Sequence, residues 1–181
     1  MKKMLFLLVA CFLLVTTKSL SQIFISFPDS QVPAESMLKG HEQETEIMSL
    51  ASGYSNPAQV GTSRLSAGKV SISDINYTKP LGKSSFALMT AVCNGTHRPR
   101  TVINFYTNNP VTNAPYKYLV ITLEEVMVSS LQQTASGGER PTESVSLGFS
   151  RIRWDYFTAT STGGVVAAAT SSWDRAKMQG F

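Results

Sequence analysis

The residues able to do nucleophilic chemistry are few, because this 181-residue chain has two histidines and two cysteines. A Ser-His-Asp site would need His41 or His97 as its base, but neither accompanies the Gly-x-Ser-x-Gly turn that presents the serine of many hydrolases. Cys93 precedes His97 by four residues, an order that suits a thiol protease. However, Cys93 falls on the apolar side of a predicted helix, where a free cysteine usually packs as a small hydrophobe. We therefore expect no catalytic residue, and a secreted hydrolase remains a third hypothesis that requires His41 or His97.

Metal and phosphate sites are not indicated either. His41 is followed by several glutamates, but they do not form the His-Glu-x-x-His spacing of a zinc site, and a solvated acidic strand face explains them better. Gly137 and Gly138 are followed by Glu139 rather than by the lysine of a phosphate-binding loop. The sequence predicts no metal and no cofactor.

The N-terminus has the three parts of a secretory signal peptide. Lys2 and Lys3 form a basic region, residues 4–15 form an apolar core, and small residues at Ser19 and Ser21 mark a cleavage site. The apolar run is shorter than the ~20 residues that a membrane-spanning helix needs. We predict a signal peptide at 1–21 and one domain at 22–181. Lipidation at Cys11, within a lipobox-like 8–11, is the second interpretation.

Removal of the signal changes the charge of the chain. The loss of Lys2, Lys3 and Lys18 leaves 13 basic residues against 12 acidic ones. So small an excess does not support a nucleic-acid partner or attachment to an anionic membrane. Cys93 is then the one remaining cysteine, so no intramolecular disulfide is expected. We expect a secreted, periplasmic or extracellular protein with no membrane contact after processing.

Three long segments share a pattern that predicts bent strands. In 137–156 the apolar residues change from odd to even positions at Ser150-Arg151, and the same change occurs within 69–78 and, at Glu124-Glu125, within 116–131. Because side chains alternate along a strand, such a change requires an extra residue or a bend. Three bent strands favour a mainly β fold, a small closed β-barrel of two antiparallel sheets, over a flat sandwich.

The rest of the chain predicts shorter elements. Strands are expected at 23–27, 44–54 and 101–106, with polar loops at 29–43 and 56–67. A helix is expected at 84–93, started by Ser84 or Ser85 and ended by Asn94-Gly95, with Phe86, Met89 and Cys93 on its apolar face. This helix should flank the outside of a sheet. A hairpin at 161–164 and a strand at 165–168 should follow.

Seven runs of the sequence, in the same order across 23–175, resemble the Hcp family, the tube protein of bacterial type VI secretion. They are 68–75 (GKVSISDI), 78–80 (TKP), 87–89 (ALM), 92–97 (VCNGTH), 118–130 (YLVITLEEVMVSS), 136–147 (SGGERPTESVSL) and 149–154 (FSRIRW). The resemblance implies a structural protein rather than an enzyme: a two-sheet β-barrel with one flanking helix that assembles into homo-hexameric rings. The rings stack into a hollow tube that carries or stabilises effectors and works with spike proteins and a contractile sheath.

The resemblance also implies where assembly contacts lie. The loop 29–43 would contact the neighbouring ring through its second half, which consists of Ser36, Met37, Leu38, Lys39, Gly40 and His41. Arg151 and Arg153 alternate with apolar residues, so they are expected on the wet face of a strand as charges between subunits. The signal peptide departs from the family, whose members assemble in the cytoplasm without one. An exported monomeric β-barrel that binds a partner protein or ligand is therefore the alternative function.

Overall fold

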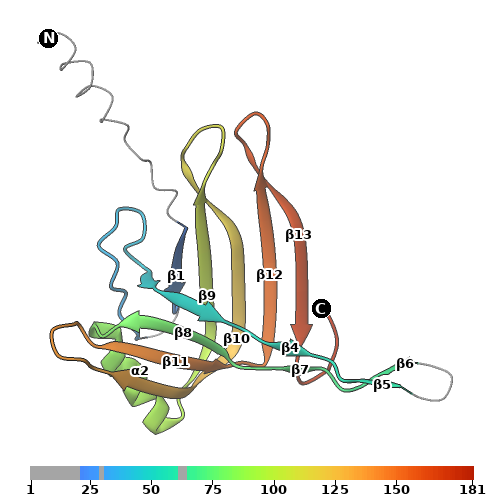
Figure 1. Cartoon of the computed structure of the whole chain (residues 1–181), viewed down its shortest axis with the longest axis horizontal. Coiled ribbons are helices and arrows are strands. Elements are labelled where there is room, and N and C mark those ends of the chain that lie inside the picture. The colour runs from blue at the N-terminus through green and yellow to red at the C-terminus, as the bar shows by residue number, and fades with distance from the viewer. Residues whose placement is uncertain (1–20, 29–30, 61–64) are drawn as a thin grey trace, which may run out of the picture.

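The computed structural model describes residues 21–28, 31–60 and 65–181 as a mainly β protein with one helix among them (Figure 1). The predicted signal peptide lies outside the described residues, except for Ser21. The elements are β1 (Gln22–Ser26), β2 (Thr45–Ile47), β3 (Ser49–Ala51), β4 (Tyr54–Ser55), β5 (Ala58–Val60), β6 (Leu65–Ala67), β7 (Ser71–Ile72), β8 (Ile75–Pro80), α2 (Lys83–Asn94), β9 (His97–Asn108), β10 (Pro115–Thr134), β11 (Thr142–Gly148), β12 (Arg151–Ala159) and β13 (Val165–Asp174).

The main sheet is antiparallel throughout. Its strands follow the order β2-β1-β9-β10-β11-β8-β3, and β12 and β13 branch from β10. The two end strands, β2 and β3, are successive in the chain and separated by Met48 alone. The Met48 amide donates to the carbonyl of Thr78 in β8 at 2.8 Å. The path therefore begins and ends on neighbouring segments of the chain.

The long strand β10 connects the two parts of this sheet. It pairs with β9 along most of its length, with β12 through residues 119–124 and with β11 through residues 127–134. Between these two sections Glu125 has a positive φ of 52°, a conformation that turns the strand. The bend predicted at Glu124-Glu125 is thus confirmed.

The other two bends are also present as breaks between strands. Phe149 and Ser150 separate β11 from β12, one residue before the predicted position, and Ser73 and Asp74 separate β7 from β8. Across the first break the inward positions change phase as expected, because Leu147 and Ile152 are both fully buried.

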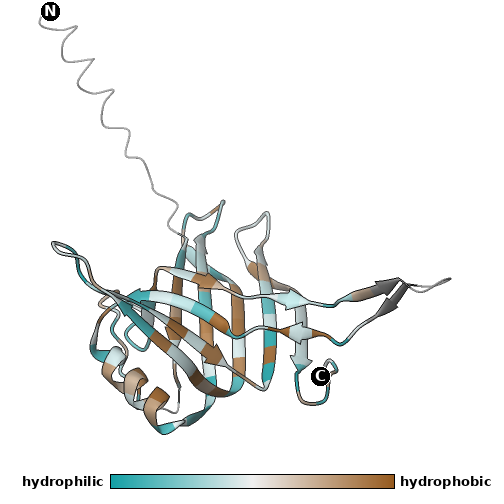
Figure 2. Cartoon of the chain, turned by 60° about the horizontal axis from the view of Figure 1, so that its bottom comes forward, coloured by the Kyte–Doolittle hydropathy of each residue, from teal (hydrophilic) through white to brown (hydrophobic). Residues whose placement is uncertain are grey.

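The core lies where the bent strands face one another and α2. It contains aliphatic side chains from β8 to β12, each of which stabilises the fold by about 1.5–3 kcal/mol when fully buried. Apolar and polar residues alternate along these strands in Figure 2. The most buried members are Ile25, Ile75, Leu88, Ile103, Leu123, Val126, Val145, Leu147 and Ile152.

The helix α2 occurs where it was predicted, but its buried face differs. Its inward residues are Ser84, Ser85, Leu88 and Ala91, whereas Phe86 is 67% exposed. The two serines turn inward because they take part in a buried polar network, and this rotates the predicted apolar face into solvent. Cys93 is likewise exposed rather than buried.

The ends of α2 match the prediction only in part. Gly95 caps the C-terminus in the left-handed conformation (φ 61°), as Asn94-Gly95 indicated. At the N-terminus, however, the cap is Gly82, and the Ser84 amide donates to the carboxylate of Glu35 instead of to a serine. Within the described ranges no helix is long and apolar enough to cross a membrane.

Two projecting hairpins complete the fold. The prediction of a polar loop at 56–67 is wrong, because β5 pairs with β6 in an arm that extends away from the rest of the molecule (Figure 1). The hairpin at 161–164 is confirmed, since Thr160 donates to Gly164 at 2.8 Å and Gly163 has a φ of 84°. The strand that follows, β13, is longer than predicted and continues to Asp174.

Candidate assembly surfaces

The segment from 31 to 44 runs along β1 and β9 and is fixed at its end by aromatic stacking. The ring of His41 stacks on Phe24 of β1 with centroids 4.1 Å apart and planes 13° from parallel. The same ring meets Tyr106 of β9 edge-on at 4.6 Å. Phe24 points away from the main core beside its neighbour Ile25, yet it is fully buried. The predicted contact residue His41 therefore anchors the segment.

A buried carboxylate strengthens this anchor. Nδ1 of His41 lies 2.6 Å from one oxygen of Glu44, and the other oxygen accepts a hydrogen bond from the side-chain amide of Asn104. Burial, together with the charge of Glu44, raises the pKa of Tyr106 to about 12. The end of the segment is thus held by a network that joins it to β9.

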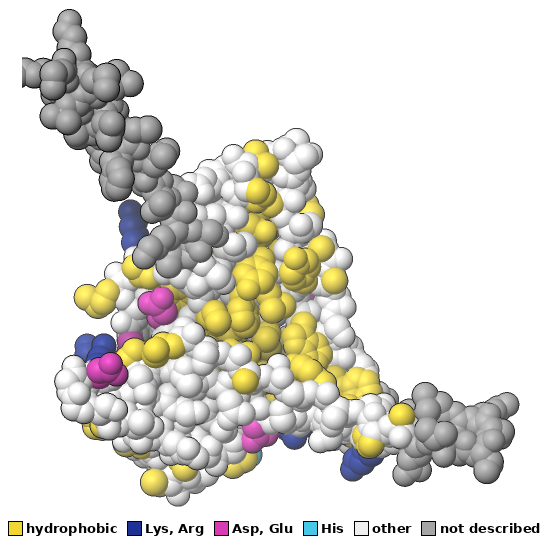
Figure 3. Space-filling model, viewed as in Figure 1, with side chains coloured by type: hydrophobic (Ala, Val, Ile, Leu, Met, Phe, Trp, Pro, Cys, Tyr) yellow, Lys and Arg dark blue, Asp and Glu magenta, His cyan; other side chains and the backbone are white. Residues whose placement is uncertain are grey.

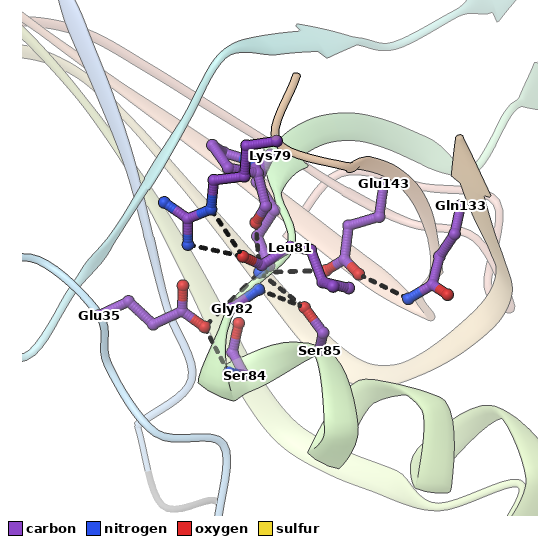
Figure 4. A network of polar contacts seen from close by, with 10 residues as sticks. Glu35, Lys79, Leu81, Gly82, Ser84, Ser85, Gln133 and Glu143 are labelled. Carbon is purple, nitrogen blue, oxygen red and sulfur yellow. Dashed lines mark hydrogen bonds and ion pairs between the residues drawn. The ribbon is translucent and has the colours of Figure 1, made fainter. Parts of the chain in front are cut away.

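The beginning of the segment is held by a second network, around Lys79 (Figure 4). The Lys79 ammonium is 1% exposed and lies 3.0 Å from Glu143 of β11 and 3.6 Å from Glu35 of the segment. It also donates to Ser85 Oγ of α2 at 3.1 Å. A buried charge is costly unless it is paired and hydrogen-bonded. Lys79 of β8 has such partners on the segment, on β11 and on α2, so it holds these elements together.

Glu35 has two roles in that network. Its carboxylate accepts from the first-turn amide of Ser84, which places negative charge at the positive end of α2. Burial raises its pKa, but the hydrogen bonds from Ser84 and the charge of Lys79 outweigh burial and lower the pKa overall.

Between the two anchors the segment projects an exposed apolar tip. Met37 is 97% exposed and Leu38 is 42% exposed. Gly40 adopts a φ of 89°, and the amide of His41 donates to Leu38 at 3.0 Å, which closes a tight turn. Ser36 accepts from the Leu38 amide at 3.2 Å. The tip, defined as residues 36–40, thus contains all the predicted contact residues of this segment except His41. Lys39 and Gly40 are exposed like Met37 and Leu38, and Ser36 is half-buried.

Arg151 and Arg153 lie on β12 and alternate with the buried Ile152, as predicted. Arg151 pairs with Glu124 of β10 at 2.9 Å, and Arg153 pairs with Asp155 at 2.9 Å. The hydrogen bonds from Arg153 hold the pKa of Asp155 below its usual value. The structure does not bring these arginines to the tip, since no hydrogen bond or ion pair connects them among the described residues.

One apolar surface was not predicted from the sequence. Residues directly paired across strands point to the same face, so Phe105, Leu119 and Tyr156 continue the rows of the core side chains. Along β12 that face changes from the fully buried Ile152, through the half-buried Trp154, to Tyr156, which is 46% exposed. Figure 3 shows the hydrophobic side chains as a band over β9, β10 and β12. We call the four partly or largely exposed members, Phe105, Leu119, Trp154 and Tyr156, the uncovered sheet face.

The strand β13 forms a free edge beside that face. It pairs with β12 on one side; no other described strand pairs with it, although Asp174 at its end forms a bridge with Gln179 of the C-terminal tail. Residues 165–171 are all exposed and carry short side chains, including Ala167, Ala168 and Ala169. A strand edge with unpaired amides and carbonyls and small side chains can accept another strand.

The candidate chemical residues do not come together. His41 belongs to the anchor, and no hydrogen bond connects Cys93 with the exposed His97 within the described part of the chain. No group of three histidine, cysteine, aspartate or glutamate side chains among the described residues has the spacing of a metal site.

Comparison with known proteins gives one consistent match. The sequence profile of the family described as "Type VI secretion system effector, Hcp" matches residues 24–156. Protein hcp1 of Pseudomonas aeruginosa is 39% identical over 89 residues, which is 49% of this chain and 54% of that protein. The matched region thus spans about half the length of this curated relative.

Solved structures agree over more of the chain. A structure of a type six secretion system protein superposes with a TM-score of 0.80 at 23% identity, covering 90% of this chain and all of the other. Hcp1 from Salmonella typhimurium superposes with a TM-score of 0.70 at 21% identity, covering 89% and 99%. At these identities the two structures show that the fold is shared.

Proposed function

Because the chain belongs to the Hcp family of type VI secretion tube proteins, we propose that it is a non-enzymatic structural protein that self-assembles into hexameric rings. The family match covers residues 24–156, which include Phe105 of β9, Leu119 of β10 and Tyr156 of β12. We further propose that the main sheet closes into a barrel, because its end strands β2 and β3 are separated by Met48 alone.

The uncovered sheet face is the observation that supports this proposal most strongly. Apolar side chains that continue a buried core into solvent are costly in an isolated chain, at about 25 cal/mol per Å² of apolar area. A second copy placed over this face would bury these side chains, and the free edge of β13 would pair with a strand of a neighbouring copy. Since the edge of one copy would meet a different element of the next, the contact is head-to-tail and can close into a ring.

Stacking of rings is assigned to the tip. Met37 and Leu38 are exposed apolar residues on a turn whose two ends are fixed by the Lys79 and His41 networks. A hollow of about 440 Å³ beside them, which Met48 and Arg140 also line, offers a place for a side chain of the neighbouring ring. Arg151 and Arg153 would then act as charges between subunits, because both remain partly exposed.

Export is the part of the proposal that rests on residues 1–21. A basic start, a short apolar core and small residues before Gln22 support cleavage and a periplasmic or extracellular location. A ring protein exported in this way would assemble outside the inner membrane, where effectors or spike proteins are its proposed partners.

Light scattering tests assembly. The full chain is expressed, and the form that remains after processing by the host is purified and measured. We expect a hexamer for the unaltered protein and for the control variant Phe86→Lys, which changes an even more exposed aromatic residue on α2. Tyr156→Lys should give a folded monomer, since it places a charge on the uncovered sheet face. If the unaltered protein is a monomer at every concentration, the alternative, a partner-binding barrel, is favoured. If Tyr156→Lys still forms hexamers, the uncovered sheet face is not the interface between subunits.

A further inference from the structure

A second hollow lies between α2 and the start of β9. Its volume is about 780 Å³, within the ~300–1,000 Å³ of small-molecule sites. Its walls include Ala87 and Ala91 as apolar surface and Thr90, Asn94, Thr96, His97 and Arg98 as polar groups. No residue of the tip or of the uncovered sheet face lines it, so it is separate from the proposed assembly surfaces.

Arg98 is the unusual member of this lining. It is 7% exposed, and its Nε is buried with no hydrogen-bond partner among the described residues. The guanidinium lies over the ring of Phe27, 5.8 Å from the ring centroid, and no described carboxylate pairs with it. Burial lowers the pKa of Arg98, while the nearby Tyr77 opposes that shift. A cation held in this way is costly unless an anion joins it.

The remaining walls favour such an anion. No aspartate or glutamate is among the described residues that line the hollow, and the hydroxyl of Thr96 and the amide of Asn94 can donate hydrogen bonds. Because Nε is buried, the terminal nitrogens of Arg98 are the part of its guanidinium that can face a ligand in the hollow. Two such nitrogens match the two oxygens of one planar acid group.

We propose that this hollow is a binding site for a carboxylate, held by the Arg98 guanidinium and the polar groups at the end of α2. A carboxylate fits better than a phosphate dianion, because the C-terminus of α2 at Asn94 carries partial negative charge that repels a double charge more strongly. The alanines and Pro99 leave apolar surface for the carbon chain that bears the carboxylate. The carboxylate belongs either to a small metabolite or to an acidic side chain of a polypeptide.

Calorimetric titration of the full chain tests the site with three probes at constant ionic strength: the α-amide of N-acetylglutamate, which has one carboxylate and is called N-acetylglutamate below, inorganic phosphate, and a short C-terminally amidated peptide with one glutamate. We expect N-acetylglutamate to bind saturably and more tightly than phosphate. Arg98→Met should weaken binding at least about tenfold, because it removes charge-assisted hydrogen bonds. Arg100→Met, a change at an exposed arginine on the same strand, should bind like the unaltered protein. If the peptide binds more tightly than N-acetylglutamate, the natural ligand is an acidic side chain of a polypeptide. If N-acetylglutamate binds more tightly, the natural ligand is a small molecule.

Thermal unfolding separates this role from a structural one. Without ligand, Arg98→Met should unfold at the same temperature as the unaltered protein or higher, because it removes a buried cation that no described carboxylate balances. Arg98→Lys keeps the charge but not the two-pronged geometry, so it should fold and still bind at least several-fold more weakly. The proposal is overturned if phosphate binds more tightly than N-acetylglutamate, if Arg98→Lys and the unaltered protein bind alike, or if Arg98→Met unfolds at a clearly lower temperature.

Discussion

Replacing Lys79 by methionine should destabilise the fold by about 3–5 kcal/mol, the usual result of removing one partner from a buried ion pair. Lys79 is 1% exposed, and the side chain of its nearer partner, Glu143, is fully buried. Methionine preserves most of the volume, so the loss comes from a carboxylate left without its cation. At ~2–4 °C per kcal/mol for a domain of this size, the midpoint of unfolding should fall by about 6–20 °C.

The structure also predicts the order of related changes. Glu143→Gln should cost less than Lys79→Met, because Glu35 at 3.6 Å still balances the lysine. Glu35→Gln should cost least, about 0.5–2 kcal/mol, since it weakens mainly the contact with the start of α2. The double variant Lys79→Met/Glu143→Leu should be more stable than Lys79→Met alone, because no buried charge remains on β11.

Thermal unfolding followed by circular dichroism, with the four variants at one protein concentration, gives these values. The concentration must be held constant because assembly also stabilises the chain. A loss below about 1 kcal/mol for Lys79→Met, or a double variant less stable than the single one, would show that the network is hydrated and does not hold the segment 31–44.

Three further predictions concern the surface and the acid range. The pKa of Glu35 is lowered from 4.5 on folding, so its contribution to stability is present above pH 4.5 and is lost as the pH falls through the lower folded value; Glu35→Gln should flatten this part of the pH–stability curve. Met37→Lys should change the free energy of unfolding by less than about 0.5 kcal/mol, because the side chain is 97% exposed, yet prevent rings from stacking in sedimentation; unchanged stacking would exclude the tip as the contact. Arg151→Ala should cost less than about 1 kcal/mol in unfolding experiments, since its pair with Glu124 is partly exposed; a larger loss would mean that the pair is structural.

The bent strands could be predicted because burial imposes a period of two on each strand. At Glu125 the positive φ shifts the phase, so Leu123 and Val126 are both fully buried although they are an odd number of positions apart. Such a phase change is visible in the sequence without knowledge of any partner strand. The mainly β class and the position of the helix α2 follow from the same kind of local pattern.

The buried face of α2 could not be predicted in this way. Its orientation depends on Glu35, which is distant in sequence, and on Lys79 of the preceding strand; together they draw Ser84 and Ser85 inward. Hydrophobic spacing alone favours Phe86 instead, and this residue is exposed. A polar contact between elements thus overrides a pattern within one element.

Of the two candidate surfaces, the tip was predicted from the sequence and the uncovered sheet face was not. The segment around Met37 stands out as a long irregular stretch, but its anchoring by Phe24 and Tyr106 depends on the sheet register. The uncovered sheet face looks like ordinary strand alternation, because Tyr156 continues the period of the buried Ile152. Only the three-dimensional arrangement shows where the cover over that face ends.

Ring formation is tested most directly by negative-stain electron microscopy of the purified full chain, imaged over a wide range of protein concentration. The proposed function predicts rings with sixfold symmetry in the class averages of the unaltered protein and single particles without a ring for Tyr156→Lys. Isolated monomers of the unaltered protein at every concentration would contradict it.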